Sequence, residues 1–308
     1  MSIKFVAYFY THSSAVLVDA LESIINVVAV SFAFYSVHLS SLPKDNNHPY
    51  GHGKIEFFSA GLEGVLIVLA SIYIVIHSVQ SFYGNSDLQH LDFGLAVVML
   101  GVVVNWFLGY FLLKEGNIQS SPTLIADGIH LKIDAYSGLI LIVALLASYW
   151  FGWLWADAVA SLMFALYMFY QGVKIIRKSI GGLMDETDEE MLKKVVDVLK
   201  THRKNNWIDI HNLRIQRYGG DLHLDCHLTL PHYWTLDQVH EQVHDFEVIV
   251  NKKIDQSVEV FIHADPCLPS CCKYCLLQNC DSRKNDFEQK INWSIKNLST
   301  NQKHFTTK

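Results

Sequence analysis

Long apolar stretches occupy the first part of this 308-residue chain and constrain its fold more than any other feature. A helix that crosses a bilayer needs about 20 predominantly apolar residues. Five stretches reach that length, at residues 13–36, 57–83, 92–113, 121–149 and 154–176. The hydrocarbon interior offers no partner for backbone polar groups, so stretches of this kind fold as helices. We therefore expect a multi-pass α-helical membrane protein with five spans.

The second part of the chain has the composition of a soluble protein. After a transmembrane domain at 1–182, residues 183–266 follow the order helix, strand, strand, helix, strand, which predicts a compact α+β domain. A cysteine-rich segment occupies 267–284. Residues 285–308 are polar and weakly patterned, and we expect a disordered or loosely helical tail.

The distribution of lysine and arginine orients the predicted helices. Loops that carry positive charge face the cytoplasm, and the loops at 83–92 and 150–155 contain neither residue. We therefore place the C-terminal domain in the cytoplasm and the protein in the plasma membrane, which in bacteria is the inner membrane. A net charge of −6 without a basic run argues against a nucleic-acid partner. The charged residues that set the orientation are Lys44, Lys54, Lys114, Lys174, Arg177 and Lys178.

Two polar pairs with the same spacing lie inside the apolar stretches. His130 and Asp134 are four residues apart, as are Glu22 and Asn26, so each pair lies on one face of its helix. Ionisable groups are expensive at membrane depth and usually line a path or bind a ligand. Together the four side chains could bind a divalent metal. The alternative is that two unrelated polar pairs hold helices together.

Four motifs, in order along residues 13–266, resemble the cation diffusion facilitator family: DALESIIN, HPYGHGKIE, ADGIHLKID, and GLMDE leading into a domain that ends FIHADP. The resemblance implies export of divalent metal from the cytoplasm in exchange for protons, by alternating access in a homodimer. It also implies six transmembrane helices and a ferredoxin-like, metallochaperone-like cytoplasmic domain. With five spans found here, we expect that the first helix is missing, truncated or very short.

By the same resemblance, Glu22, Asn26, His130 and Asp134 form the transport site. Asn26 departs from the family pattern, because an amide oxygen replaces a carboxylate and cannot accept a proton near neutral pH. A tetrahedral site with a histidine ligand favours Zn²⁺ as substrate, while iron(II), manganese and cobalt stay open. A membrane metal sensor that no longer transports is the alternative from another class. We expect no enzyme, since the chain offers no HExxH motif.

Two further sites use histidine and aspartate. The loop after the first span carries Asp45, His48 and His52, which are either a second, weaker metal site or a solvated polar loop. In the cytoplasmic domain, His263 and Asp265 share one face of a predicted strand. The resemblance extends this pair to a binuclear zinc site that stabilises the dimer, formed by His211, His227, His240, His263 and Asp265.

The cysteine-rich segment and one buried lysine complete the candidates. C-x2-C and C-x3-C spacings predict a soft-metal site, and the alternative in the reducing cytoplasm is a set of idle thiols. Lys132 falls between the two ligands of its helix and should point away from the metal. We expect it either to extend towards the membrane interface or to pair with an acid such as Asp19 or Asp157. The candidate thiols are Cys267, Cys271, Cys272, Cys275 and Cys280.

Overall fold

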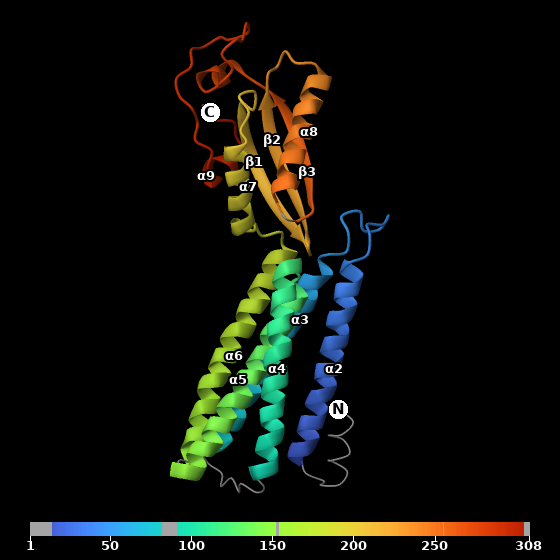
Figure 1. The fold of residues 1–308 in the computed structure, drawn as a ribbon, viewed down its shortest axis with the longest axis vertical. Coiled ribbons are helices and arrows are strands. Elements are labelled where there is room, and N and C mark those ends of the chain that lie inside the picture. Colours follow the sequence, from blue (N-terminus) through green and yellow to red (C-terminus); the bar gives the residue numbers. More distant parts are fainter. Residues whose placement is uncertain (1–13, 82–90, 152–153, 255, 305–308) are drawn as a thin grey trace. The chain divides into compact units, whose positions relative to one another are not determined.

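The fold is taken from a computed structural model that describes residues 14–81, 91–151, 154–254 and 256–304 (Figure 1). Several side chains inside its helices, including those of residues 14–26, are also outside the described part. The chain divides into two compact units, Met1–Met184 and Asp185–Lys308.

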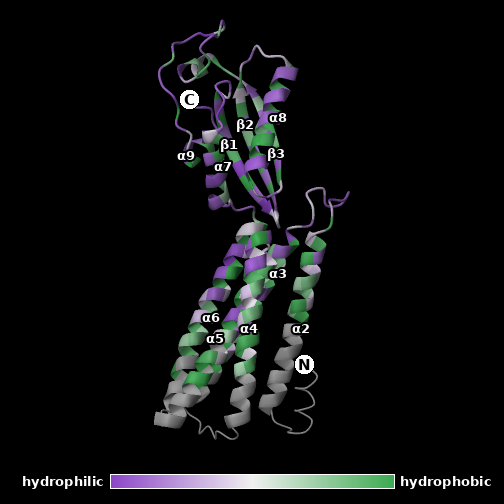
Figure 2. Ribbon diagram, in the orientation of Figure 1, coloured by the Kyte–Doolittle hydropathy of each residue, from purple (hydrophilic) through white to green (hydrophobic). Residues whose placement is uncertain are grey.

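The first unit consists of long helices that coincide with the five predicted apolar stretches. Hydrophobic residues dominate their described parts (Figure 2). Among the described residues, one segment, Ile55–Ile76, is long and apolar enough by itself to cross a membrane. The number of spans therefore stays a prediction. The helices are α2 (Ser14–Ser40), α3 (Ile55–Ser81), α4 (Leu91–Gln119), α5 (Pro122–Phe151) and α6 (Leu154–Leu183).

Glycines allow two pairs of these helices to approach closely. A Cβ atom at Gly172 of α6 would lie 3.0 Å from the carbonyl oxygen of Gly64 in α3. In the α4–α5 pair, a Cβ atom at Gly128 would lie 2.8 Å from the side chain of Leu113. Helices in lipid associate through this kind of close packing between small residues, because the lipid provides no hydrophobic driving force.

The loop-side ends of three helices meet at the buried carboxylate of Glu56. Ser40 at the end of α2 donates a hydrogen bond to Glu56 Oε1 at 2.6 Å, and Ser121 just before α5 donates to Glu56 Oε2. Thr123 donates to the Glu56 carbonyl oxygen at 3.1 Å. These bonds compensate for burial of the carboxylate and fix α5 against α3, which positions the polar face of α5 described below.

The second unit is a three-stranded sheet with two helices on one face. Strands β1 (Asp209–Tyr218) and β2 (Asp221–Leu230) form an antiparallel hairpin, and β3 (Val258–Pro266) lies parallel to β2. Helix α7 (Glu189–Thr201) packs on β1, α8 (Leu236–Lys253) packs on β3, and the two helices contact each other. This is the predicted order of elements, and it confirms a small α+β domain.

The strand register places histidines and acids on the face opposite the helices. His211, His227 and His263 are direct neighbours across β1, β2 and β3. The next row along the strands is Asp209, Thr229 and Asp265. Because side chains alternate between faces, these two rows share one side of the sheet.

A β-bulge in β1 makes that arrangement possible. The register shifts between His211 and Arg214, and Asn212 has a left-handed φ of 53°, which asparagine tolerates better than most residues. The extra residue changes which positions face the core, so Ile210 and Ile215 both lie in it. His211 therefore faces away from the core, while the alternation of core-facing residues shifts by one position after it, from Ile210 to Leu213 and Ile215.

The C-terminal segment packs against the second unit, so the expectation of a disordered or loosely helical tail is wrong for residues 285–304. Trp293 is 1% exposed and Leu298 is fully buried in the domain core. Arg203 at the end of α7 stacks on the Trp293 ring and donates a 2.7 Å hydrogen bond to the carbonyl oxygen of Ile291. This segment contains the short helix α9 (Ile295–Leu298), and the cysteine-rich segment before it contains a 3₁₀ turn, η1 (Pro269–Lys273). A few apolar residues anchor a polar stretch that has no periodicity of its own.

Helix packing in the first unit is testable with two glycine substitutions. Gly172→Val places a branched side chain against the backbone of α3, and overpacking of this kind costs about 1–3 kcal/mol. We expect a lower thermal midpoint in detergent than for Gly101→Val, because a Cβ atom at Gly101 meets nothing within 4 Å. Equal midpoints for the two variants would show that the close approach of α3 and α6 is not needed.

Candidate metal-binding sites

His130 on α5 lies between two carboxylates in the first unit. Its Nδ1 atom forms a hydrogen bond with Oε1 of Glu63 on α3, and its Nε2 atom lies 3.6 Å from Oδ1 of Asp134. Asp127, one turn earlier on α5, is close enough to act on His130 and Glu63 electrostatically. The i,i+4 spacing therefore does bring His130 and Asp134 together on one face of α5.

Glu63 determines which nitrogen of His130 is available to a metal. When Glu63 is ionised, Nδ1 of His130 carries a proton and donates a hydrogen bond to the carboxylate. The lone pair of the neutral imidazole then lies on Nε2, on the Asp134 side. A carboxylate behind a histidine ligand is a common device that fixes the tautomer and the ring orientation. We did not predict Glu63 from the sequence. The rule that drew attention to His130, an ionisable group within an apolar helix, applies equally to Glu63.

The remaining residues of the predicted transport site lie outside the described side chains. Glu22 and Asn26 belong to α2, whose backbone contacts α5. Lys132 extends its ammonium group towards α4, 5.6 Å from the ring centre of Trp106 and 5.9 Å from that of Tyr110. Cation–π contacts with these two aromatic rings accommodate its charge, and the side chains of Asp19 and Asp157, the acids that we expected beside it, lie outside the described part.

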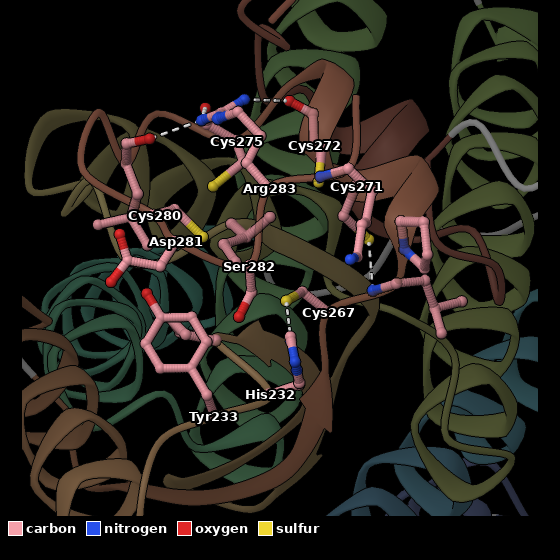
Figure 3. A pocket seen from close by; sticks show the side chains of 16 residues that line it. His232, Tyr233, Cys267, Cys271, Cys272, Cys275, Cys280, Asp281, Ser282 and Arg283 are labelled. Carbon is pink, nitrogen blue, oxygen red and sulfur yellow. Dashed lines mark hydrogen bonds between the residues drawn. The ribbon is translucent and has the colours of Figure 1, made fainter. Parts of the chain in front are cut away.

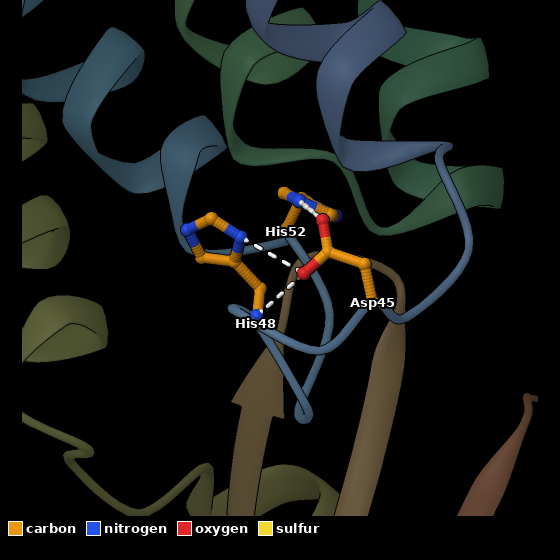
Figure 4. Close-up of side chains that lie close together, drawn as sticks. All are labelled: Asp45, His48 and His52. Carbon is orange, nitrogen blue, oxygen red and sulfur yellow. Dashed lines mark hydrogen bonds and ion pairs between the residues drawn. The ribbon is translucent and has the colours of Figure 1, made fainter.

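Two groups of three donors, among the described residues, have all their ligand atoms within 4.8 Å of one another. The first is the loop group Asp45, His48 and His52 (Figure 4). Asp45 Oδ1 accepts hydrogen bonds from the backbone amides of Asn47 and His48, at 2.8 and 2.6 Å. These bonds, that of His48 foremost, lower the pKa of Asp45. Its other oxygen lies 3.4 Å from Nε2 of His52, so an ionised carboxylate faces two imidazole rings.

The second group lies on the histidine face of the sheet. Asp265 Oδ2 is 3.3 Å from Nε2 of His211 and 3.3 Å from Nδ1 of His227. Its Oδ1 is 3.6 Å from Nε2 of His263, which is more exposed. A carboxylate with one oxygen towards two histidines and the other towards a third is suited to bridge two metal ions. His240 is exposed on α8, and among the described residues it is not part of this compact donor group.

Burial prepares His211 to act as a ligand. Burial lowers the pKa of His211, against the opposing influence of Asp209 and Asp265. The imidazole is therefore neutral near pH 7, which is the form that binds metal. Asp209 behind it is fully buried, and its carboxylate accepts hydrogen bonds from the backbone amide and from Nδ1 of His304. The tail that was expected to be loose thus supports this group.

Lys303, from the same tail, places a positive charge beside the carboxylate of Asp265. Lys303 Nζ lies 3.6 Å from Asp265 Oδ2, the oxygen that faces His211 and His227, and donates a 2.9 Å hydrogen bond to the Pro266 carbonyl oxygen. A metal ion between the two histidines would compete with this ammonium group for the same oxygen.

The five candidate cysteines of the cysteine-rich segment line one pocket of the second unit (Figure 3). All six cysteines of the chain are free thiols, and Cys226 is buried in β2, away from this pocket. No three of the pocket thiols belong to a compact donor group of the kind described above, within the part of the chain that the structure describes.

Removal of the lysine should strengthen metal binding at the histidine face. For Lys303→Met we expect a Zn²⁺ affinity about three- to tenfold higher, because the partly buried ammonium no longer competes for Asp265. Competition with a chromophoric chelator on the full-length protein in detergent measures this affinity, and His227→Ala identifies the binding phase that belongs to the site. Lys296→Met, an exposed lysine of the same tail, is the control. An unchanged affinity in Lys303→Met would contradict the competition.

Known proteins share both units of this chain. A model of the cation efflux transmembrane domain matches residues 1–184, and a model of the cytoplasmic domain of cation efflux proteins matches residues 187–267. The chain is 28% identical over 266 residues to an uncharacterized transporter of Synechocystis, with 86% of each chain covered.

Two further relatives are named as efflux proteins. The chain is 28% identical over 261 residues to the manganese efflux system protein MneP of Bacillus subtilis, covering 82% of this chain and 87% of the relative. It is 26% identical over 268 residues to the cation-efflux pump FieF of Shewanella oneidensis, covering 86% and 89%. The chain therefore belongs to the cation diffusion facilitator family of cation efflux proteins, whose members are transporters.

Proposed function

We propose that the chain exports divalent metal ions from the cytoplasm in exchange for protons, with Zn²⁺ as its first substrate, and works as a homodimer. The observation that carries the proposal is the arrangement at His130, where Nδ1 is held by Glu63 and Nε2 faces Asp134. Glu22 and Asn26 of the adjacent α2 would complete the metal shell. The match of the C-terminal unit to the family's cytoplasmic domain supports the orientation and the dimer.

Proton exchange follows from the chemistry of these ligands. A metal ion binds ionised carboxylates and a neutral imidazole, so it must displace any protons that they carry. The site would take up metal when open to the cytoplasm and would release it when protons from the other side reach the ligands.

Manganese is a second candidate substrate. The site as proposed is rich in oxygen, with Asp134, Glu22 and the amide of Asn26, and Glu63 adds a carboxylate close behind His130. Oxygen ligands suit manganese better than sulfur or nitrogen ligands do. One relative at 28% identity is a manganese efflux protein. Zinc stays first because a histidine ligand within a four-residue site favours it.

The direct test is metal uptake into proteoliposomes under an imposed pH gradient, with zinc, manganese, iron(II) and cobalt compared. We expect saturable, gradient-dependent uptake, fastest with zinc, and loss of uptake to background in Asp134→Asn. Asn26→Asp should keep or increase zinc uptake, because it restores a carboxylate. Manganese uptake that exceeds zinc uptake would favour the second candidate. Binding without uptake of any ion would favour a metal sensor, and undiminished uptake in Asp134→Asn would exclude this site.

Glu63 gives a separate prediction about the histidine. Glu63→Gln keeps the shape of the side chain but removes the charge that holds the Nδ1 proton of His130. We expect transport-site affinity to fall about 10- to 100-fold, as for other carboxylates behind a metal-binding histidine, and the pH profile of uptake to shift.

Glu115→Gln, which removes a carboxylate from the end of α4, provides the matched control. Both variants are compared for uptake rate against pH and for metal affinity in detergent. If Glu63→Gln and Glu115→Gln behave alike, Glu63 has no role at the site.

A further inference from the structure

The pocket that follows β3 concentrates sulfur in a way that neither the transport site nor the histidine face requires. Its volume is about 400 Å³, and it is lined by five cysteines and by His232, whose Nδ1 lies 3.4 Å from the sulfur of Cys267 (Figure 3). None of its lining residues belongs to the Asp265 group or to the loop group.

One of the five thiols has a structural role. Cys271 is 1% exposed, and its sulfur accepts a hydrogen bond from the Leu268 amide at 3.3 Å and lies 3.2 Å from the Tyr274 hydroxyl oxygen. The other four follow the pattern C-x4-C-x2-C-x4-C, with a C-x2-C pair at the centre. Paired cysteines at this spacing are characteristic of tetrahedral zinc sites. The four thiols are Cys267, Cys272, Cys275 and Cys280.

Arg283 holds the turn that carries the central pair. Its guanidinium group donates hydrogen bonds to the carbonyl oxygens of Cys272, Cys275 and Leu277, at 2.9, 3.2 and 2.6 Å. The Lys284 amide lies 3.4 Å from the Cys272 sulfur and can donate to it. Backbone amides and a cation beside the sulfurs would stabilise the negative charge of thiolates around a divalent ion.

The pocket does not activate its thiols as nucleophiles. Burial raises the pKa of Cys267 and Cys275, which keeps both thiols protonated and weakly nucleophilic near neutral pH. A metal ion would release these protons as it binds. A disulfide is disfavoured in a reducing compartment.

We propose that this pocket is a soft-metal site of the Zn²⁺ and Cd²⁺ class, with Cys267, Cys272, Cys275 and Cys280 as ligands. His232 stands beside Cys267 as an alternative donor. Among the described residues, no three of these sulfurs lie within 4.8 Å of one another, so a bound ion would draw them closer together. No electron transfer is involved: a divalent ion replaces the thiol protons, which pass to water. The site does not depend on transport activity.

Cobalt(II) tests the proposal directly, because cobalt–thiolate bonds absorb strongly in the near ultraviolet, whereas histidine and carboxylate ligands give only weak bands. The full-length protein is reduced, freed of metal with a chelator, and titrated with Co²⁺ in detergent. We expect one equivalent per chain to produce the thiolate band and Zn²⁺ to abolish it. Cys275→Ala and Cys280→Ala should remove the band or weaken cobalt binding more than tenfold. Cys226→Ala removes a thiol outside the pocket and should leave the band unchanged.

A second measurement needs no substitution. In a denaturant concentration that exposes Cys226 but does not release the metal, Zn²⁺ should protect the four ligand thiols from alkylation and leave Cys226 reactive. Mass spectrometry of peptides measures the alkylation of each thiol. A reduced protein that gives no thiolate band at saturating Co²⁺ would overturn the proposal. So would a band that survives in the Cys275→Ala, Cys280→Ala double variant, or a disulfide between pocket cysteines in protein prepared without oxygen. Loss of zinc uptake with the band intact would instead count against the proposed transport function alone.

Discussion

The cost of placing ionisable groups among apolar helices governs the first unit of this protein. His130, Glu63 and Asp134 would each be costly alone, and in contact they provide one another with hydrogen-bond partners and opposite charge. That contact requires α3 and α5 to lie at a defined distance and rotation. The Glu56 carboxylate, which joins the ends of α2, α3 and α5, contributes to this geometry, and glycines pack α6 closely on α3 and α4 closely on α5. The metal chemistry of the unit therefore depends on helix packing.

A comparable dependence holds in the second unit, where strand register brings the ligands together. Three histidines from three strands form one row, and Asp265 lies in the next row on the same face. The bulge at Asn212 turns His211 to that face while the apolar residues of β1 stay in the core. The C-terminal segment then adds Lys303 and His304 around the group. Local backbone geometry and a distant segment thus both shape one site.

Predictions from the sequence succeeded where the pattern was local. The apolar stretches gave the helices, alternation gave the strands, and the i,i+4 rule placed His130 beside Asp134. They failed where long-range packing decides. The polar tail is held by Trp293 and Leu298, which carry no periodic signal. Glu63 is distant from His130 in the sequence, so no local pattern joins them. The role of His240, which was included by resemblance and is exposed on α8, stays a prediction.

The sequence by itself determined the class of this protein, because hydrophobic length, charge distribution and ordered motifs are properties of local composition. It also determined which residue types were available as ligands. Only the tertiary structure decided which of them meet. The nitrogen of His130 that faces Asp134, the oxygen of Asp265 that faces two histidines, and the cysteine sulfur that is already engaged all depend on how separate segments pack. A hydrogen bond between residues far apart in the chain leaves no spacing in the sequence from which to read it.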